Sequence, residues 1–305
     1  MTPVQKQEYD VVIIGGGVAG LSAALVLGRA RRKVAVVDSG TPRNQLASHA
    51  HGFLTRDGTT PAELLRLARE EVRGYGVDLI EATVVDVTEA RVAVLRDGSR
   101  VSGRHLILAT GLRDVLPELA GADERWGRDL LQCPYCHGWE VRDRKLGVLA
   151  TGDTSFEQAL LVRQWSPQVT LFTHISGEPD DVQRRRLAAR HVAIVPGEVK
   201  GLVVEDDALA ALELADGQRV DCQTLFVEPE AAVDSAIISS VGCGRAEDGC
   251  ITTDGIGKTD IEGVWAVGNA NDPSAQLIAA AGDAYRVAVS VNAELVREDV
   301  AAAGG

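Results

Sequence analysis

The 305-residue sequence predicts an α/β fold made of two Rossmann-like dinucleotide-binding domains. Two observations support this prediction: a strand–turn–helix–strand pattern occurs twice along the chain, and small residues form the turn each time. The length is about twice that of a typical single domain, which also favours two domains. Hydrophobic residues make up 45% of the chain and charged residues 25%, the usual mix for a globular protein that can bury a large core.

The first module occupies the N-terminal part of the chain. A β-branched strand runs into a glycine-rich turn over 9–20, and an apolar helix follows over 18–29. A second strand is expected over 33–38. The next segments predict a helix over 60–75 and a strand-rich stretch over 77–109.

The second module repeats the pattern. An apolar strand over 145–152 reaches a turn, and a helix over 154–165 and a strand over 168–174 follow. Several short strands are expected between 192 and 227. A long helix over 274–296 is expected at the end of the chain.

The net charge and the N-terminal segment exclude several kinds of partner. The net charge is −13, whereas a protein that binds phosphate backbones needs the opposite sign, so no nucleic-acid partner is expected. Residues 1–10 are polar, and the apolar run over 11–14 is far too short for a signal peptide or a membrane span. We therefore expect no membrane partner and a cytoplasmic location.

Gly15, Gly17 and Gly20 form a G-x-G-x-x-G motif between a strand and a helix. The first glycine permits a tight turn, the second lets the backbone approach a pyrophosphate, and the third lets the helix pack closely on the strand. Asp38 ends the second strand 18 residues after Gly20, where a carboxylate can accept hydrogen bonds from both ribose hydroxyls. The motif therefore predicts a bound dinucleotide.

Cys133 and Cys136 form the closely spaced pair among the five cysteines. In a reducing compartment a single C-x-x-C pair indicates redox or metal chemistry more often than a structural bridge. His137 follows directly, and its ordinary pKa near neutrality suits a base that activates a thiol.

Zinc binding is the alternative interpretation of this pair, with His49 and His51 as the remaining ligands. The sequence has no second C-x-x-C and no H-x3-5-H pattern, so no metal is expected. Cys222, Cys243 and Cys250 lack such spacing and are expected to be buried bystanders.

Two later segments place small residues at the end of a predicted strand. Ala109, Thr110 and Gly111 form the first, and Gly268 and Asn269 form the second. Small residues at such points allow the chain to pass close to a bound cofactor. The N-terminus of the helix that follows the second segment can stabilise negative charge on a reduced ring system.

Taken together and in this order, these motifs resemble the low-molecular-weight thioredoxin reductase family, from Tyr9 to about Val296. The resemblance implies two domains of the three-layer ββα type, the second inserted in the first. The FAD-binding domain is expected at 1–117 and 247–305, and a nucleotide-binding-like domain that carries the C-x-x-C at 118–246. FAD as the cofactor and a homodimer are further expectations from the same likeness.

By this likeness, the residues that contact FAD come from all parts of the first domain and its neighbouring loops. They are Gly15, Gly17, Gly20 and Asp38 at the ADP half, Val84 near the adenine, Ala109, Thr110, Gly111, Gly268 and His51 beside the flavin half, Asn269 at the ribityl chain, and Gln276 and Leu277 at the pyrimidine edge.

The second nucleotide site departs from the reductase pattern. The reductases bind NADPH with a second G-x-G-x-x-A motif and an H-R-R cluster that holds the 2′-phosphate. Residues 150–155 here read Ala-Thr-Gly-Asp-Thr-Ser, and residues 173–178, at the place of the cluster, contain no arginine. A 2′-phosphate needs charged donors. Arg184–Arg186 come later, where we expect a solvated helix face, although another basic residue that reaches the phosphate stays an open alternative.

The redox motif also departs from the reductase pattern. The reductases have Asp where this chain has His137, and the string C-P-Y-C-H-G-W-E is similar to the FAD-dependent dithiol oxidases that close disulfides in gliotoxin and holomycin. The resemblance implies a dithiol oxidase of antibiotic biosynthesis with Cys133, Cys136 and His137 as catalytic residues. Its substrate would be a small-molecule dithiol, its electron acceptor O2 and its product H2O2. The alternatives are an NAD(P)H-dependent thioredoxin reductase-like disulfide reductase and a non-catalytic flavin redox sensor.

Overall fold

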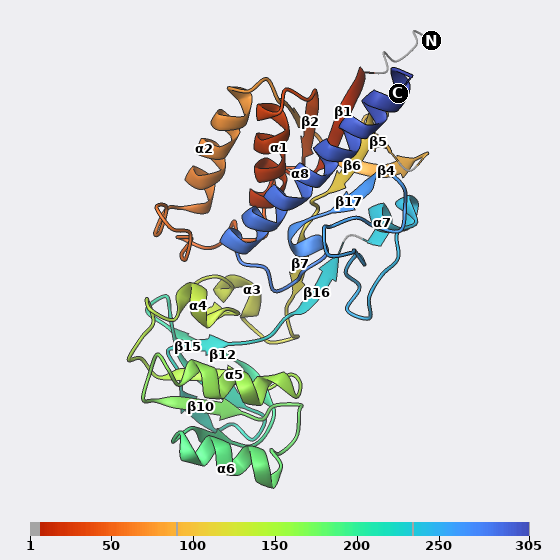
Figure 1. Cartoon of the computed structure of the whole chain (residues 1–305). Helices are drawn as coiled ribbons and strands as arrows, with labels where there is room; N and C mark the ends of the chain where they lie inside the picture. The colour runs from red at the N-terminus through yellow and green to blue at the C-terminus, as the bar shows by residue number, and fades with distance from the viewer. Residues whose placement is uncertain (1–6, 90, 234, 305) are drawn as a thin grey trace. The chain divides into compact units, whose positions relative to one another are not determined.

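Figure 1 shows the computed structural model of the chain, which describes residues 7–89, 91–233 and 235–304. The chain divides into two compact units. Unit 1 comprises Met1–Gln45, Phe53–Arg113 and Ala231–Gly305, and unit 2 comprises Leu46–Gly52 and Asp114–Glu230. Each unit contains a parallel sheet flanked by helices, which confirms the α/β fold with two Rossmann-like domains.

Unit 1 is built on a seven-stranded sheet with the order β3-β2-β1-β6-β5-β4, in which β17 also pairs with β6. Its strands are β1 (Gln7–Ile14), β2 (Val34–Asp38), β3 (Asp78–Glu81), β4 (Val84–Thr88), β5 (Val92–Leu95), β6 (Arg100–Leu108) and β17 (Val264–Ala266). The strands β1, β2, β3, β6 and β17 run parallel, whereas β4, β5 and β6 form an antiparallel meander. The carboxyl ends of the parallel strands therefore meet at one edge of the sheet.

The two faces of the strand β1 belong to two different hydrophobic cores. The helices of unit 1 are α1 (Val18–Arg29), α2 (Pro61–Arg73), α7 (Ser235–Val241), the short 3-10 helix η1 (Gly268–Ala270) and α8 (Leu277–Ala302). Because side chains alternate along a strand, Val11 and Ile13 of β1 pack in one core with α1, α2 and α8. Val12 and Ile14 pack in a second core with β4, β5 and α7. The result is the expected three-layer ββα arrangement.

Local sequence explains the ends of two helices. α2 begins at Pro61 because the Thr60 hydroxyl accepts a hydrogen bond from the Glu63 N–H at 3.2 Å, and proline suits a first helical position. α8 continues past its expected end at residue 296 to Ala302. Its last turns are held because Arg104 donates hydrogen bonds to Glu298 and Asp299, each at 2.7 Å.

Unit 2 repeats the architecture around a five-stranded parallel sheet of order β11-β10-β9-β15-β8. Its elements are α3 (Ala122–Arg125), β8 (Leu130–Leu131), α4 (Pro134–His137), β9 (Leu146–Leu149), α5 (Thr154–Val162), β10 (Val169–Phe172), α6 (Asp181–Ala189), β11 (Ala193–Val195), β12 (Val199–Glu205), β13 (Ala208–Leu214), β14 (Arg219–Asp221) and β15 (Thr224–Phe226). One core packs α5 and α6 on the sheet, and the other packs the antiparallel strands β12–β14 on its opposite face.

Apart from the short segment Leu46–Gly52, the chain passes between the units in β7 (Leu112–Val115) and β16 (Glu230–Val233), which pair with each other. These crossings lie at 113/114 and 230/231, whereas the sequence-based boundaries lie at 117/118 and 246/247. α7 lies within the segment 231–246 that the two divisions assign differently, and its buried Ile237, Ile238 and Val241 pack in a core of unit 1. The assignment of FAD to one unit stays a prediction.

Among the described residues, no helix has the length and hydrophobicity of a membrane span.

Candidate active site

The three glycines of the first turn have different surroundings in unit 1. A Cβ on Gly15, whose φ is +107°, would lie 2.2 Å from the carbonyl oxygen of Ala109. A Cβ on Gly20 would lie 2.0 Å from the carbonyl oxygen of Gly15. A Cβ on Gly17 would meet no described atom within 4 Å. Gly15 and Gly20 are therefore required by the close packing of α1 on the strands, whereas Gly17 borders open space.

This open space lies at the N-terminus of α1. Gly17 is the N-cap residue, and among the described residues no side chain caps the helix and no acidic residue occupies its first turn. The first backbone N–H groups of a helix lack partners within the helix and carry a partial positive charge. This helix end has the properties of a phosphate site.

Asp38 lies at the end of β2 beside the same turn. A Cβ on Gly16 would approach its Oδ2 atom to 2.7 Å, so a residue without a side chain is needed there. Arg69 of α2 donates a hydrogen bond to Asp38 Oδ2 at 2.5 Å and fixes the carboxylate. The sequence predicted Asp38 but not Arg69, because nothing local links two residues on separate elements.

The end of β6 contributes a second part of the site in unit 1. Ala109 is buried, and Gly111 follows with a φ of +66°. Thr110 Oγ1 is buried and has no hydrogen-bond partner among the described residues. A buried hydroxyl normally has a partner, so this group fits a ligand that supplies one.

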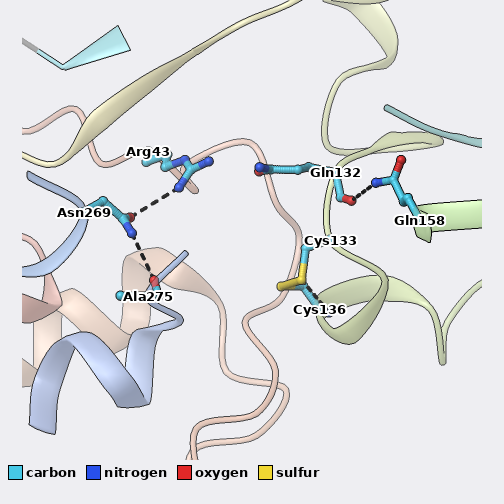
Figure 2. Close-up of a disulfide and its surroundings, with 7 residues drawn as sticks. All are labelled: Arg43, Gln132, Cys133, Cys136, Gln158, Asn269 and Ala275. Atoms are coloured by element: carbon cyan, nitrogen blue, oxygen red, sulfur yellow. Dashed lines mark hydrogen bonds between the residues drawn. A yellow bond between two sulfur atoms is a disulfide. The ribbon is translucent and has the colours of Figure 1, made fainter. Parts of the chain in front are cut away.

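The segment after β17 contributes a third part. Gly268 has a φ of +66°, and a Cβ there would lie 2.8 Å from Cβ of Ala19 in α1. Asn269 follows, and its Oδ1 atom accepts a hydrogen bond from Arg43 at 3.3 Å (Figure 2). Its Nδ2 atom donates to the carbonyl oxygen of Ala275 at 3.0 Å. Asn269 thereby shapes the loop that leads into α8.

α8 begins where the sequence predicted a cofactor-facing helix start. Gln276 is its N-cap residue and Leu277 its first residue. Val84, in contrast, begins β4 with its side chain buried in a hydrophobic core, so any contact with adenine would involve its backbone. The roles of these three residues toward FAD stay predictions. The glycine turn, Asp38 and the unpartnered Thr110 hydroxyl all fit a bound FAD.

Cys133 and Cys136 form a disulfide in unit 2, with their Cα atoms 5.3 Å apart (Figure 2). Cys133 is the N-cap residue of α4, and its Sγ atom accepts a hydrogen bond from the Cys136 N–H at 3.2 Å. This donor would stabilise a thiolate at Cys133 when the disulfide opens. The preceding segment is fixed because Gln158 Nε2 donates to the carbonyl oxygen of Gln132 at 3.1 Å.

His137 ends α4, directly after the redox pair. Both of its ring nitrogens are buried and have no hydrogen-bond partner among the described residues. Burial lowers the pKa of His137, and the nearby Glu140 carboxylate opposes this effect only in part. The imidazole is therefore neutral near pH 7, the state in which it can accept a proton.

His51 lies in unit 2, in the loop 46–52 that groups with this unit. Its Nε2 atom is 3.5 Å from Glu140 Oε1. Sequence reasoning placed His51 beside the flavin, which stays a prediction, and it missed Glu140. The available signal was the position of Glu140 three residues after His137, since residues at that spacing share one side of a helical turn.

The alternative zinc interpretation requires both motif cysteines as free thiolates. The two motif cysteines are joined to each other, and the described residues contain no group of three or more His, Cys, Asp or Glu residues placed to hold a metal ion. Cys222, Cys243 and Cys250 are buried, and burial raises the pKa of all three thiols.

The second nucleotide turn, in unit 2, is occupied by groups of the chain itself. Ser155 Oγ accepts hydrogen bonds from the N–H groups of Thr151 at 3.1 Å and Gly152 at 3.4 Å. Thr154 is the first residue of α5, and its hydroxyl donates a hydrogen bond to the carboxylate of Glu228. Two N–H groups of this turn are thus used internally, and the carboxylate of Glu228 lies beside the turn.

The place of the reductase arginine cluster is also occupied differently. His174 Nδ1 accepts a hydrogen bond from the Val199 N–H at 3.1 Å. Arg184 pairs with Glu178, and Arg186 pairs with Glu157. Both arginines lie on the exposed side of α6, as predicted.

Comparisons with known proteins agree with this description. A family model described as pyridine nucleotide-disulphide oxidoreductase matches residues 9–284. Thioredoxin reductase sirT of Leptosphaeria maculans is 30% identical over 315 residues, covering 96% of this chain and 96% of that protein. Thioredoxin reductase tcpT of Claviceps purpurea is 30% identical and covers 85% of this chain and 86% of its own. The crystal structure of HlmI has 48% identity and a TM-score of 0.91, covering 96% of this chain and 94% of that one.

The matched region includes the glycine turn, the redox disulfide and the first turns of α8. The expected resemblance to thioredoxin reductases and the expected cofactor are therefore confirmed. The chain belongs to the pyridine nucleotide-disulphide oxidoreductase family, as a thioredoxin reductase-like flavoprotein with FAD as its cofactor.

Proposed function

We propose that this flavoprotein is a dithiol oxidase that closes a disulfide in a small-molecule dithiol, with O2 as the electron acceptor and H2O2 as the product. The pair Cys133/Cys136 exchanges electrons with the substrate, and His137 handles the protons. The proposal is supported by the disulfide in unit 2 and by the neutral imidazole that follows it.

The second nucleotide turn is the observation that carries this proposal. A nicotinamide dinucleotide would need the backbone N–H groups of the turn, but Ser155 Oγ already accepts from two of them. The pyrophosphate would also approach the carboxylates of Glu228 and of the N-cap residue Asp153. Electrons therefore enter from a dithiol rather than from a nicotinamide.

Bound FAD supplies a two-electron acceptor for the reduced cysteine pair. Neutral His137 takes the proton of one substrate thiol, and the resulting thiolate attacks Cys133 Sγ. The bond between the two cysteine sulfurs breaks, and Cys136 leaves as a thiolate. His137 releases the first proton and accepts the proton of the second substrate thiol, which attacks the substrate sulfur bound to Cys133 and displaces Cys133 as a thiolate. The substrate has then lost two electrons and two protons, and the cysteine pair holds the two electrons.

A second candidate function follows from the names of the relatives. The curated relatives sirT and tcpT are called thioredoxin reductases, and the family name refers to pyridine nucleotides. An NAD(P)H-dependent disulfide reductase is therefore the competing proposal. It requires that a nicotinamide dinucleotide displace the internal contacts of Ser155 and Glu228.

Two measurements on the purified holoenzyme separate the candidates. An oxidase consumes O2 with a dithiol such as dithiothreitol in the absence of any nicotinamide, and its flavin absorbance does not change on anaerobic addition of NADPH or NADH. Bleaching by either nicotinamide, together with no O2 uptake across several dithiols, would show a reductase. Cys136→Ser should keep the yellow FAD but lose turnover, and retained turnover would remove the pair from the mechanism.

We also propose that the enzyme acts in the cytoplasm as a homodimer. α8 supports a dimer, because it exposes a row of large apolar side chains: Ile278, Tyr285, Val289, Val296 and Val300. Exposed apolar surface of this kind is typical of a protein interface. Sedimentation velocity at several concentrations tests the proposal, and a monomer at every concentration would refute it.

A further inference from the structure

Both ring nitrogens of the proposed base, His137, are shielded from solvent. His137 is half-buried, its ring nitrogens have no hydrogen-bond partner among the described residues, and the carbonyl of Cys133 lies near the ring. In the proposed reaction His137 receives a proton from each incoming substrate. A buried imidazolium is costly, so a group beside it must stabilise this charge and take the proton onward.

Glu140 is placed to do this. Its N–H donates a hydrogen bond to the carbonyl oxygen of His137 at 3.1 Å, so the two residues lie on one turn of the chain. Its carboxylate lies 3.5 Å from His51 Nε2. The side chains of His51 and Glu140 are 21% and 42% exposed, so both groups reach solvent. Both also act electrostatically on the His137 ring.

We propose that Glu140 and His51 form a carboxylate–imidazole pair that supports proton transfer to His137 and passes the proton to solvent. The inference rests on the proposed oxidase function and adds two residues to it. Glu140 acts through His137, and it is therefore a positioning residue. A proton moves from the substrate thiol to His137, then to the pair, and then to water, so no additional reactant is needed.

The charges around His137 define what each member of the pair does. Glu140 raises the pKa of the ring, and His51 lowers it, while the neighbouring carbonyl of Cys133 raises it. Burial remains the largest effect and lowers the pKa. Removing the carboxylate and removing the imidazole should therefore move the titration of His137 in opposite directions.

The test is the pH dependence of anaerobic flavin reduction by dithiothreitol, followed by stopped-flow absorbance. The rate falls on the acid side as His137 becomes protonated. Glu140→Gln should move this acid limb to lower pH and reduce the plateau rate about tenfold, since it removes part of a general-base effect. His51→Gln should move the acid limb to higher pH. Glu140→Asp should restore much of the plateau rate.

Glu157→Gln is the matched control, because Glu157 is an exposed carboxylate of the same unit that pairs with Arg186. It should leave the profile unchanged. Profiles of Glu140→Gln and His51→Gln that superimpose on the wild type would overturn the inference. Equal loss of rate without any shift of the acid limb would assign the pair a structural role only, which also overturns it.

A second readout separates this inference from the oxidase proposal. The ring signals of His137 in the oxidised holoenzyme can be titrated by NMR without turnover. If wild-type flavin is not reduced by any dithiol, the oxidase proposal fails. The direction of the His137 titration shifts in the two variants still supports or refutes the pair.

Discussion

Gly17→Ala adds one methyl group at the N-cap of α1, and it should weaken FAD binding while the fold persists. The φ of −75° and ψ of −175° of Gly17 are extended and suit alanine. The new Cβ would meet no described atom within 4 Å. Replacing an N-cap glycine by alanine lowers the free energy of unfolding by about 0.5–1 kcal/mol. Each kcal/mol lowers the Tm of a domain of this size by about 2–4 °C.

The effect on FAD should be larger than the effect on the fold. A methyl group in this space keeps a pyrophosphate from the N–H groups of α1. A loss of about 1.4 kcal/mol or more in binding raises the dissociation constant at least about tenfold. The apoprotein's Tm, followed by circular dichroism, and the FAD dissociation constant, followed by flavin fluorescence, measure the two effects separately.

Gly20→Ala is the matched comparison, because its Cβ would lie 2.0 Å from the carbonyl oxygen of Gly15. Such an overlap forces the backbone to move, with a cost of about 1–3 kcal/mol or more. Its apoprotein should melt well below that of Gly17→Ala. Wild-type FAD affinity in Gly17→Ala, or equal destabilisation by both substitutions, would refute the argument.

Two further predictions concern buried titratable groups. Trp265 Nε1–H donates to His105 Nδ1 at 3.1 Å, and His105 Nε2 lies 3.0 Å from Glu298. Burial lowers the pKa of His105, so the unfolded chain binds a proton first as pH falls through the ordinary histidine pKa of about 6.5. The free energy of unfolding should therefore decrease below this pH. Urea titrations at several pH values should find a weaker pH dependence of this free energy in His105→Gln. Burial also raises the pKa of Cys222 to about 12. In the reduced native protein, iodoacetamide should therefore label Cys133 and Cys136 but not Cys222. Peptide mass spectrometry measures the labelling, and modified Cys222 would contradict the prediction.

The parts of the site that lie within one turn of the chain were predictable from the sequence. The glycine turn needs three glycines at fixed spacing because two of them touch neighbouring backbone, as the overlaps at Gly15 and Gly20 show. The redox pair is likewise local, since Cys133 caps the turn that contains Cys136. Such geometry depends only on spacing.

The pairs that join distant segments could not be predicted in this way. Arg69 holds Asp38 across 31 positions, and Glu228 meets Thr154 across 74. No periodicity or motif links such residues, because their proximity is produced by the packing of complete elements. The division at 230/231 depends on packing of the same kind, because α7 joins unit 1 through tertiary packing on β4 rather than through a local signal.

The two modules show how one architecture can support different chemistry. α1 follows β1 and α5 follows β9, each a strand of a parallel sheet, so both modules place a helix N-terminus directly after such a strand. α1 has Gly17 at its N-cap and no acidic residue in its first turn, whereas α5 has Asp153 at its N-cap and Glu157 in its first turn. The helix dipole favours an anion at the N-terminus of α1 and at the N-terminus of α5, but at α5 the chain supplies the negative charge itself. Replacing Ser155 by glycine would free two N–H groups without removing these carboxylates or adding an arginine. Such a variant should therefore still fail to bind NADPH, and only combined removal of the acidic groups and introduction of basic ones should create a nicotinamide site.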